Sequence, residues 1–209
     1  RADESFGGAL QLGAFNHARA DFSGIAQVGV LNGQGDLFED DVWEDERFAG
    51  VAQVGAVNSA NAFRGAFQLG VASFSADFAG GIQLGALAAG AQEFRGLAQI
   101  GVFTIADESY GAQIGAGAVS LEEHEGLQLG AAVNWAGTMT GAQIGLVNVA
   151  EEVNGVQIGL YNHTNRLRGL QIGLVNHAED GVLQWTALLN MGFDEGGYEY
   201  SNYASRNAE

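Results

Sequence analysis

The sequence predicts an all-β protein, a repeat β-solenoid of about 11–12 coils with a period of about 15 residues. Three observations lead to this prediction. The tripeptide Gln-(Leu/Ile/Val)-Gly recurs along most of the chain, apolar residues alternate around each copy, and the 209 residues include 33 Gly and no Pro. A 15-residue period is too short for the helix pairs of common helical repeats, so each unit must be built from strands.

The Gln of this tripeptide is the anchor of the repeat. It returns every 13 to 16 residues, apart from one interval of 26. Stacked coils would place these side chains in a ladder. The anchors are Gln11, Gln27, Gln53, Gln68, Gln83, Gln99, Gln113, Gln128, Gln143, Gln157 and Gln171, followed by a degenerate twelfth copy at Gln184-Trp185-Thr186.

The alternation around each Gln predicts the two faces of a strand. The residues one before, one after and three after the Gln share one face, while Gln and the Gly two residues later share the other. The position after Gln is apolar in every copy, which predicts that it forms the core. We therefore expect Ile144→Asp or Ile158→Asp to prevent folding and Gln143→Ser to be much milder.

The Gly and Asn columns carry further expectations. Gly weakens a strand, so its recurrence predicts a close approach by a second sheet, another molecule or a flat ligand. Asn tolerates a left-handed turn and is expected to end the strand at Asn16, Asn32, Asn58, Asn148, Asn162 and Asn176. An apolar residue shortly before the next Gly, such as Phe48 or Phe63, suggests a short return segment.

The chain is expected to form a single repeat domain, 1–209. The repeats cover 8–190, an acidic loop insertion covers 33–47, and a Tyr-rich segment at 191–209 is a C-terminal cap or assembly segment. An antiparallel β-meander or barrel is the alternative architecture, because alternation alone also fits long antiparallel strands.

Composition and motifs exclude several classes of function. Eight Arg, no Lys and 25 acidic residues give a net charge of −17, which disfavours sequence-independent binding to nucleic acid. The absence of Cys and Lys removes thiolate and Schiff-base chemistry. No common catalytic motif occurs, so we predict that the protein is not an enzyme, although a glycosidase with paired carboxylates stays open. The four His are best explained by their places in the repeat.

The acidic insertion suggests one metal site. Asp40, Asp41, Glu44 and Asp45 provide the hard oxygen ligands that Ca²⁺ prefers. The alternative is a solvated charged loop. No other cofactor is indicated.

Two strings near the end of the repeats resemble a known family. Gln157-Ile-Gly-Leu-Tyr-Asn162 and Gln171-Ile-Gly-Leu-Val-Asn176-His-Ala resemble the Gln-x-Gly-x-x-Asn-x-Ala core of curli-type repeats, and they are also similar to bacterial surface proteins with Gly-Leu-Gln-Ile-Gly-Leu-Val-Asn units. The resemblance covers about residues 8–190 and implies a β-solenoid in an extracellular fibre.

The predicted function is structural. We expect a non-enzymatic extracellular or cell-surface protein whose copies assemble into a filament, sheath or surface layer, with no membrane insertion. Its assembly residues would be Phe193, Tyr198, Tyr200 and Tyr203. One alternative is a module that binds polysaccharide or ice through a flat Gln/Gly face. A second is an outer-membrane β-barrel.

Overall fold

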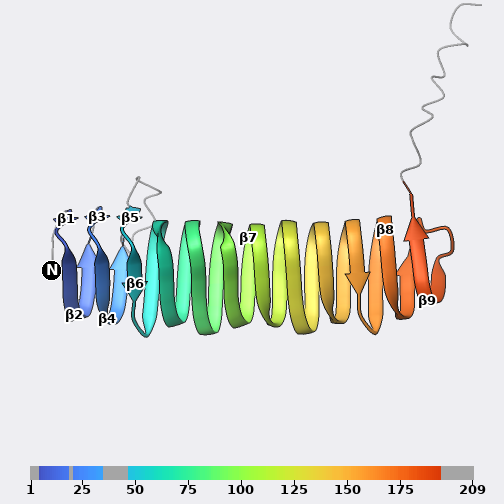
Figure 1. Cartoon of the computed structure of the whole chain (residues 1–209), viewed down its shortest axis with the longest axis horizontal. Helices are drawn as coiled ribbons and strands as arrows, with labels where there is room; N and C mark the ends of the chain where they lie inside the picture. Colours follow the sequence, from blue (N-terminus) through green and yellow to red (C-terminus); the bar gives the residue numbers. More distant parts are fainter. Residues whose placement is uncertain (1–4, 19–20, 35–46, 194–209) are drawn as a thin grey trace, which may run out of the picture.

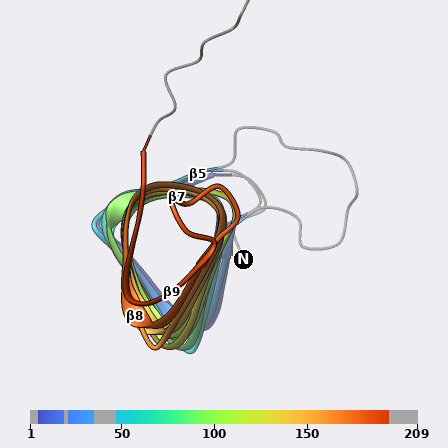
Figure 2. The same ribbon diagram turned by 90° about the vertical axis from the view of Figure 1, so that its right-hand side faces the viewer.

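The chain winds into a β-solenoid. The computed structural model describes residues 5–18, 21–34 and 47–193. Its coils stack in one row from the N-terminal to the C-terminal end (Figure 1). Viewed along the row, the coils superpose on a rounded triangle (Figure 2).

The coils are joined by parallel pairing in register. Gln11 lies beside Gln27, and Asn16 lies beside Asn32. The same in-register pairing joins the last coils, where Gln157 lies beside Gln171. The strands are β1 (Phe6–Gly7), β2 (Leu10–Ala18), β3 (Phe22–Ser23), β4 (Ala26–Gln34), β5 (Arg47–Ala49), β6 (Ala52–Val54), β7 (Val57–Ile158), β8 (Tyr161–Ala178) and β9 (Trp185–Gly192). The solenoid prediction is confirmed, and the antiparallel meander or barrel is wrong for the stacked coils.

The interior is the face that the sequence analysis placed outside. Every anchor Gln of the repeat from Gln27 to Gln171 is buried, whereas Leu12 is 66% exposed and Ile158 is 39% exposed. The predicted alternation is correct, but the predicted core column faces outward. The expectation that Ile158→Asp prevents folding while Gln143→Ser is mild is therefore wrong. Its premise, that an amide face belongs in water, fails because the amides bind one another.

The Gln side chains form a continuous hydrogen-bonded ladder. Each Nε2 donates to the Oε1 of the Gln one coil earlier, at 2.7–3.0 Å, through ten consecutive bonds from Gln27 to Gln171. In most coils Nε2 also contacts a backbone carbonyl of its own coil, as when Gln83 donates to Gly90 at 2.9 Å. Amide ladders of this kind satisfy buried polar groups and stabilise stacked strands.

A second amide ladder, together with backbone carbonyls, explains the Gly column. Asn16 donates to Asn32 Oδ1 at 2.9 Å, so this ladder points toward the C-terminus, opposite to the Gln ladder. A Cβ on Gly29 would lie 2.6 Å from Asn16 Nδ2 and would also collide with the carbonyl oxygen of Gly13. The groups that approach Gly are thus the backbone carbonyl of the preceding coil and, in the coils that contain it, the Asn ladder. The expected left-handed turns at Asn are wrong, since Leu188 is the only non-Gly residue with positive φ among those described.

The third interior column is aromatic in the N-terminal half. Six Phe rings stack with centroid separations of 4.7–5.1 Å, and all except the terminal Phe6 are buried. The rings belong to Phe6, Phe22, Phe48, Phe63, Phe78 and Phe94. Beyond Phe94 the column continues with buried Ser109, His124, Met139, Val153 and Leu167.

The residue type of this third column changes at the coil where the segment between the corner Gly and Gln becomes shorter. In the Phe coils two residues separate the corner Gly from Gln, as in Gly96-Leu97-Ala98-Gln99, whereas from Gly111 onward only one does. The Gly residues of these shorter corners adopt positive φ, from 126° to 152°. Glycine adopts this conformation at little cost, so the corner loses one residue without breaking the ladders.

The last coil is covered by a reversed strand. The predicted twelfth copy does not form a coil, because β9 turns back and pairs antiparallel with β8. Asn190 Nδ2 donates to Gln171 Oε1 at 3.3 Å and closes the end of the Gln ladder. The cap is therefore β9, which lies mostly before the predicted cap segment 191–209.

Candidate functional site: an outward apolar face

The outward residues of the Gln-bearing strands form one apolar surface. We define the apolar face as the residues one before, one after and three after the Gln in each of the eleven copies. All 33 positions hold Ala, Val, Leu, Ile or Phe. Leu146, Leu160 and Leu174 in its C-terminal half are 52–60% exposed. Soluble monomers rarely expose a continuous apolar patch of this length.

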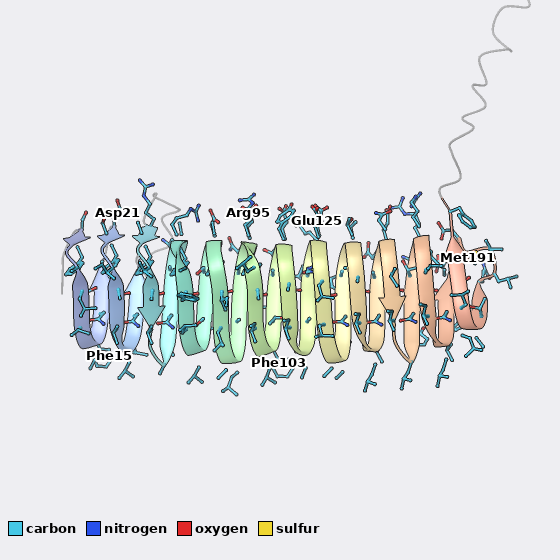
Figure 3. All side chains as sticks on the ribbon, viewed as in Figure 1. Phe15, Asp21, Arg95, Phe103, Glu125 and Met191 are labelled. Carbon is cyan, nitrogen blue, oxygen red and sulfur yellow. The ribbon has the colours of Figure 1, made fainter. Side chains whose placement is uncertain are left out.

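The apolar surface continues around the adjoining edge of the solenoid. Phe15 is 76% exposed, Leu87 is 61% exposed and Phe103 is 65% exposed. Figure 3 shows Phe15 and Phe103 on the same edge, among side chains that are mostly carbon. The apolar face and this edge run together along the row of coils.

Charged residues occupy the side opposite the edge that carries Phe15 and Phe103. Asp21, Arg95 and Glu125 project there, away from Phe15 and Phe103 (Figure 3). In every repeat, the segment that runs from the corner Gly to the Asn position contains no Asp, Glu, Arg or Lys. The charges are thus confined to the part of each coil around the Phe column.

Ion pairs join neighbouring charges on this side. Arg64 pairs with Asp77 and Arg95 pairs with Glu93, while Glu152 binds Arg166 at 2.6 Å and Arg168 at 3.0 Å. The three Arg residues that directly precede a corner Gly, Arg64, Arg95 and Arg168, are all paired with a carboxylate in this way. Exposed pairs of this kind contribute little stability, so their main effect is a solvated surface.

The buried polar residues near mid-solenoid do not form an accessible reactive site. Ser120 Oγ lies 3.5 Å from His124 Nδ1 and donates to Gln113 Oε1 at 3.0 Å, and all three residues are buried. Burial lowers the pKa of His124 to about 4, so the ring is neutral at pH 7. His124 Nε2 has no hydrogen-bond partner. A substrate could not reach this Ser–His pair without opening the coil.

Two other His residues form a ring stack at the C-terminal end. His163 Nδ1 lies 2.7 Å from His177 Nδ1, and the His177 ring stacks on Trp185 of β9 with centroids 4.0 Å apart. Burial and the neighbouring His177 lower the pKa of His163. This stack holds the capping strand on the last coil.

The predicted site residues have different outcomes. The ladder Gln residues come together as expected, but inside the solenoid, so the proposed Gln/Gly binding face for polysaccharide or ice is wrong. Phe193 is 68% exposed at the end of β9. Tyr198, Tyr200 and Tyr203, and the calcium ligands Asp40, Asp41, Glu44 and Asp45, lie outside the described residues. Within the described ranges, no three His, Asp or Glu residues are grouped as metal ligands.

Comparison with known proteins adds no relative. No family model, curated protein or solved structure matches the chain. In the residues that the structure describes, no helix is long and apolar enough to cross a membrane.

The apolar face is a feature that could not be assigned correctly from the sequence. Its columns were recognised but assigned to the core. A usable signal was present in the Gln column, which holds Gln in all eleven copies without any change to a charged or hydroxyl residue. Solvated positions rarely show such uniformity within one chain, whereas a hydrogen-bonded ladder requires it.

Proposed function

We propose that this chain is a structural protein that assembles with copies of itself. The observation that carries the proposal is the apolar face, which runs the length of the solenoid with no polar interruption. An apolar surface of this extent is stabilised by burial, at about 25 cal/mol per Å² removed from water. Association is the simplest way in which a finished solenoid can bury it.

The interior supports a building-block role. The Gln ladder ties every coil to the next, and the Phe column stacks six consecutive coils. In a stack of this kind each coil contacts only its neighbours, so the surface repeats at a fixed spacing along the rod. A rigid surface with a regular spacing suits an ordered assembly, such as the filament, sheath or surface layer expected from the sequence. That the protein lies outside the cell remains a prediction from its sequence.

Sedimentation velocity tests this function. The full chain should sediment as dimers or larger species at micromolar concentration, and negative-stain micrographs at higher concentration should show regular assemblies. A chain that stays monomeric at high concentration, in high salt and with Ca²⁺ present would refute the structural role.

A further inference from the structure

We propose that the apolar face binds the same face of a second copy, forming a face-to-face dimer that is the unit of assembly. This inference rests on the proposed structural function and identifies the contact that carries it. The area of the face, its chemistry and the position of the charges all favour this contact.

The area of the face matches a stable interface. Eleven strands give ten spacings of about 4.8 Å, hence a length of about 48 Å. The three outward columns span four residues of about 3.3 Å each, which side-chain width extends to about 16 Å. The face can therefore bury about 800 Å² per copy, the amount that each partner buries in a standard protein interface.

The chemistry of the face resembles the inner face of a β-sandwich. Aliphatic side chains point outward from a sheet in every coil, and two such sheets pack about 10 Å apart. A two-fold axis makes the surface self-complementary, since the same patch is used by both copies. The buried centre would contain no polar group that needs a partner.

The distribution of charge favours a second copy. The face-to-face contact itself contains no charged group, because the charged residues lie around the Phe column of each coil, outside the apolar face. The Debye length is only about 8 Å at physiological salt, so charges outside the contact are partly screened from one another. A net charge of −17 therefore opposes this arrangement less than it opposes contacts between the charged sides.

A lipid surface fits the face less well. Proteins that lie on membranes usually place Lys and Arg beside the apolar face and Trp at its border. Here the 33 positions of the face contain no Trp or Tyr, the chain has no Lys, and the charged side is acidic. Two identical apolar sheets can bury each other without Lys, Arg or Trp at their borders.

Spin labels test the geometry of the pair. The chain has no Cys, so Val102→Cys introduces a single label site in the sixth of eleven copies, at the middle of the face. We expect an intermolecular label distance of about 20 Å, from a sheet spacing of about 10 Å and two label arms. Glu125→Cys, on the charged side, is the matched control and should show no intermolecular distance in this range.

A matched pair of charge substitutions tests the contact itself. Leu146→Glu places a carboxylate on the apolar face, and Asn165→Glu adds the same charge at an exposed position away from it. Because a symmetric dimer contains the substitution twice, Leu146→Glu should raise the dissociation constant at least about tenfold, whereas Asn165→Glu should change it less than about twofold. Circular dichroism should show the same β signal in both variants.

The possible results of these experiments distinguish the face-to-face pair from the broader structural role. Assembly with long label distances and no effect of Leu146→Glu would overturn the face-to-face pair and leave a structural role through other contacts. A chain that remains monomeric would refute the structural role as well. Monomers that sediment with phosphatidylcholine vesicles, and lose this binding in Leu146→Glu, would identify lipid as the occupant.

Discussion

Gln157 shows how an amide side chain can belong to a protein interior. Its Nε2 donates to Gln143 Oε1 at 2.7 Å and to the His163 carbonyl at 3.3 Å, and its Oε1 accepts from Gln171 at 2.8 Å. Burying an amide is costly only when its hydrogen bonds are lost. The ladder supplies these bonds by repetition.

Replacing Gln157 should therefore damage the fold more than replacing the apolar residue beside it. Gln157→Leu leaves Gln143 Oε1 and one N–H of Gln171 without partners and should reduce the free energy of unfolding by about 3 kcal/mol. Ile158→Thr, on the outward face, should cost less than about 1 kcal/mol. Urea unfolding measures both, and equal losses would contradict the inward orientation of Gln.

Gly159 illustrates the steric role of the Gly column. A Cβ there would collide with the Gly145 carbonyl oxygen and lie 2.6 Å from Asn148 Nδ2. Gly159→Ala should lower the free energy of unfolding by about 2 kcal/mol, because the ladder must shift to accept the methyl group. Gly7→Ala is the control, since a Cβ at Gly7 meets no atom within 4 Å. Thermal unfolding of the two variants should differ accordingly.

His124 should make stability depend on pH. Its pKa is about 4 in the folded chain and 6.5 in the unfolded chain, so the unfolded chain binds the proton first as pH falls. Stability is fully present above pH 6.5 and declines toward pH 4. Between pH 7 and pH 5 this residue should remove about 2 kcal/mol from the free energy of unfolding.

A matched variant isolates this effect. His124→Met continues the column with the residue type found one coil later, at Met139, and removes the titrating group. Its urea unfolding should lose about 2 kcal/mol less between pH 7 and pH 5 than that of the native chain. The same loss in both proteins would assign the pH dependence to other groups.

At the scale of the coil, the Asn ladder is interrupted between Asn58 and Asn134, where its place is taken by Ser73, Ala89, Thr104 and Ala118. Ala118 occupies the place of Asn in its coil, and Asn134 Oδ1 in the next coil is buried without a partner. Thr104 Oγ1, one coil before Ala118, is also buried and unpaired. The C-terminal end of this interruption lies beside Ser109 and His124, where the Phe column has ended.

Filling this gap should stabilise the solenoid. Ala118→Asn could donate to Asn134 Oδ1 and accept from Thr104 Oγ1, which would raise the free energy of unfolding by about 1 kcal/mol. Ala116→Asn, which points outward in the same strand, should change it by less than about 0.5 kcal/mol. Chemical unfolding measures the free energy of unfolding of both variants. A decrease for Ala118→Asn would show that neighbouring side chains already fill the space around Ala118.

At the scale of the whole molecule, salt should strengthen association. The apolar face drives copies together while a net charge of −17 drives them apart, and added salt screens only the second effect. Raising NaCl from about 0.05 M to about 0.5 M shortens the Debye length severalfold. The dissociation constant from sedimentation should therefore fall. A rise with salt would mean that ion pairs, rather than the apolar face, hold the copies together.

The whole molecule also shows which expectations could come from the sequence. The period, the β class and the stacking of equivalent residues followed from the spacing of the repeat. The ladder members were correctly identified as a group. The capping role of β9 could not be foreseen, because its pairing with β8 reverses the direction that a twelfth repeat predicts.

The sequence by itself determined the repeat unit and the alternation of its side chains, because both are properties of neighbouring residues along the chain. It did not determine which face turns inward, since a period of two allows either answer. The tertiary structure decided this by bringing each Gln within 3.0 Å of the Gln in the coil before it. Only that contact between coils removes the cost of burying the amides, and it leaves the aliphatic columns outside to meet a partner.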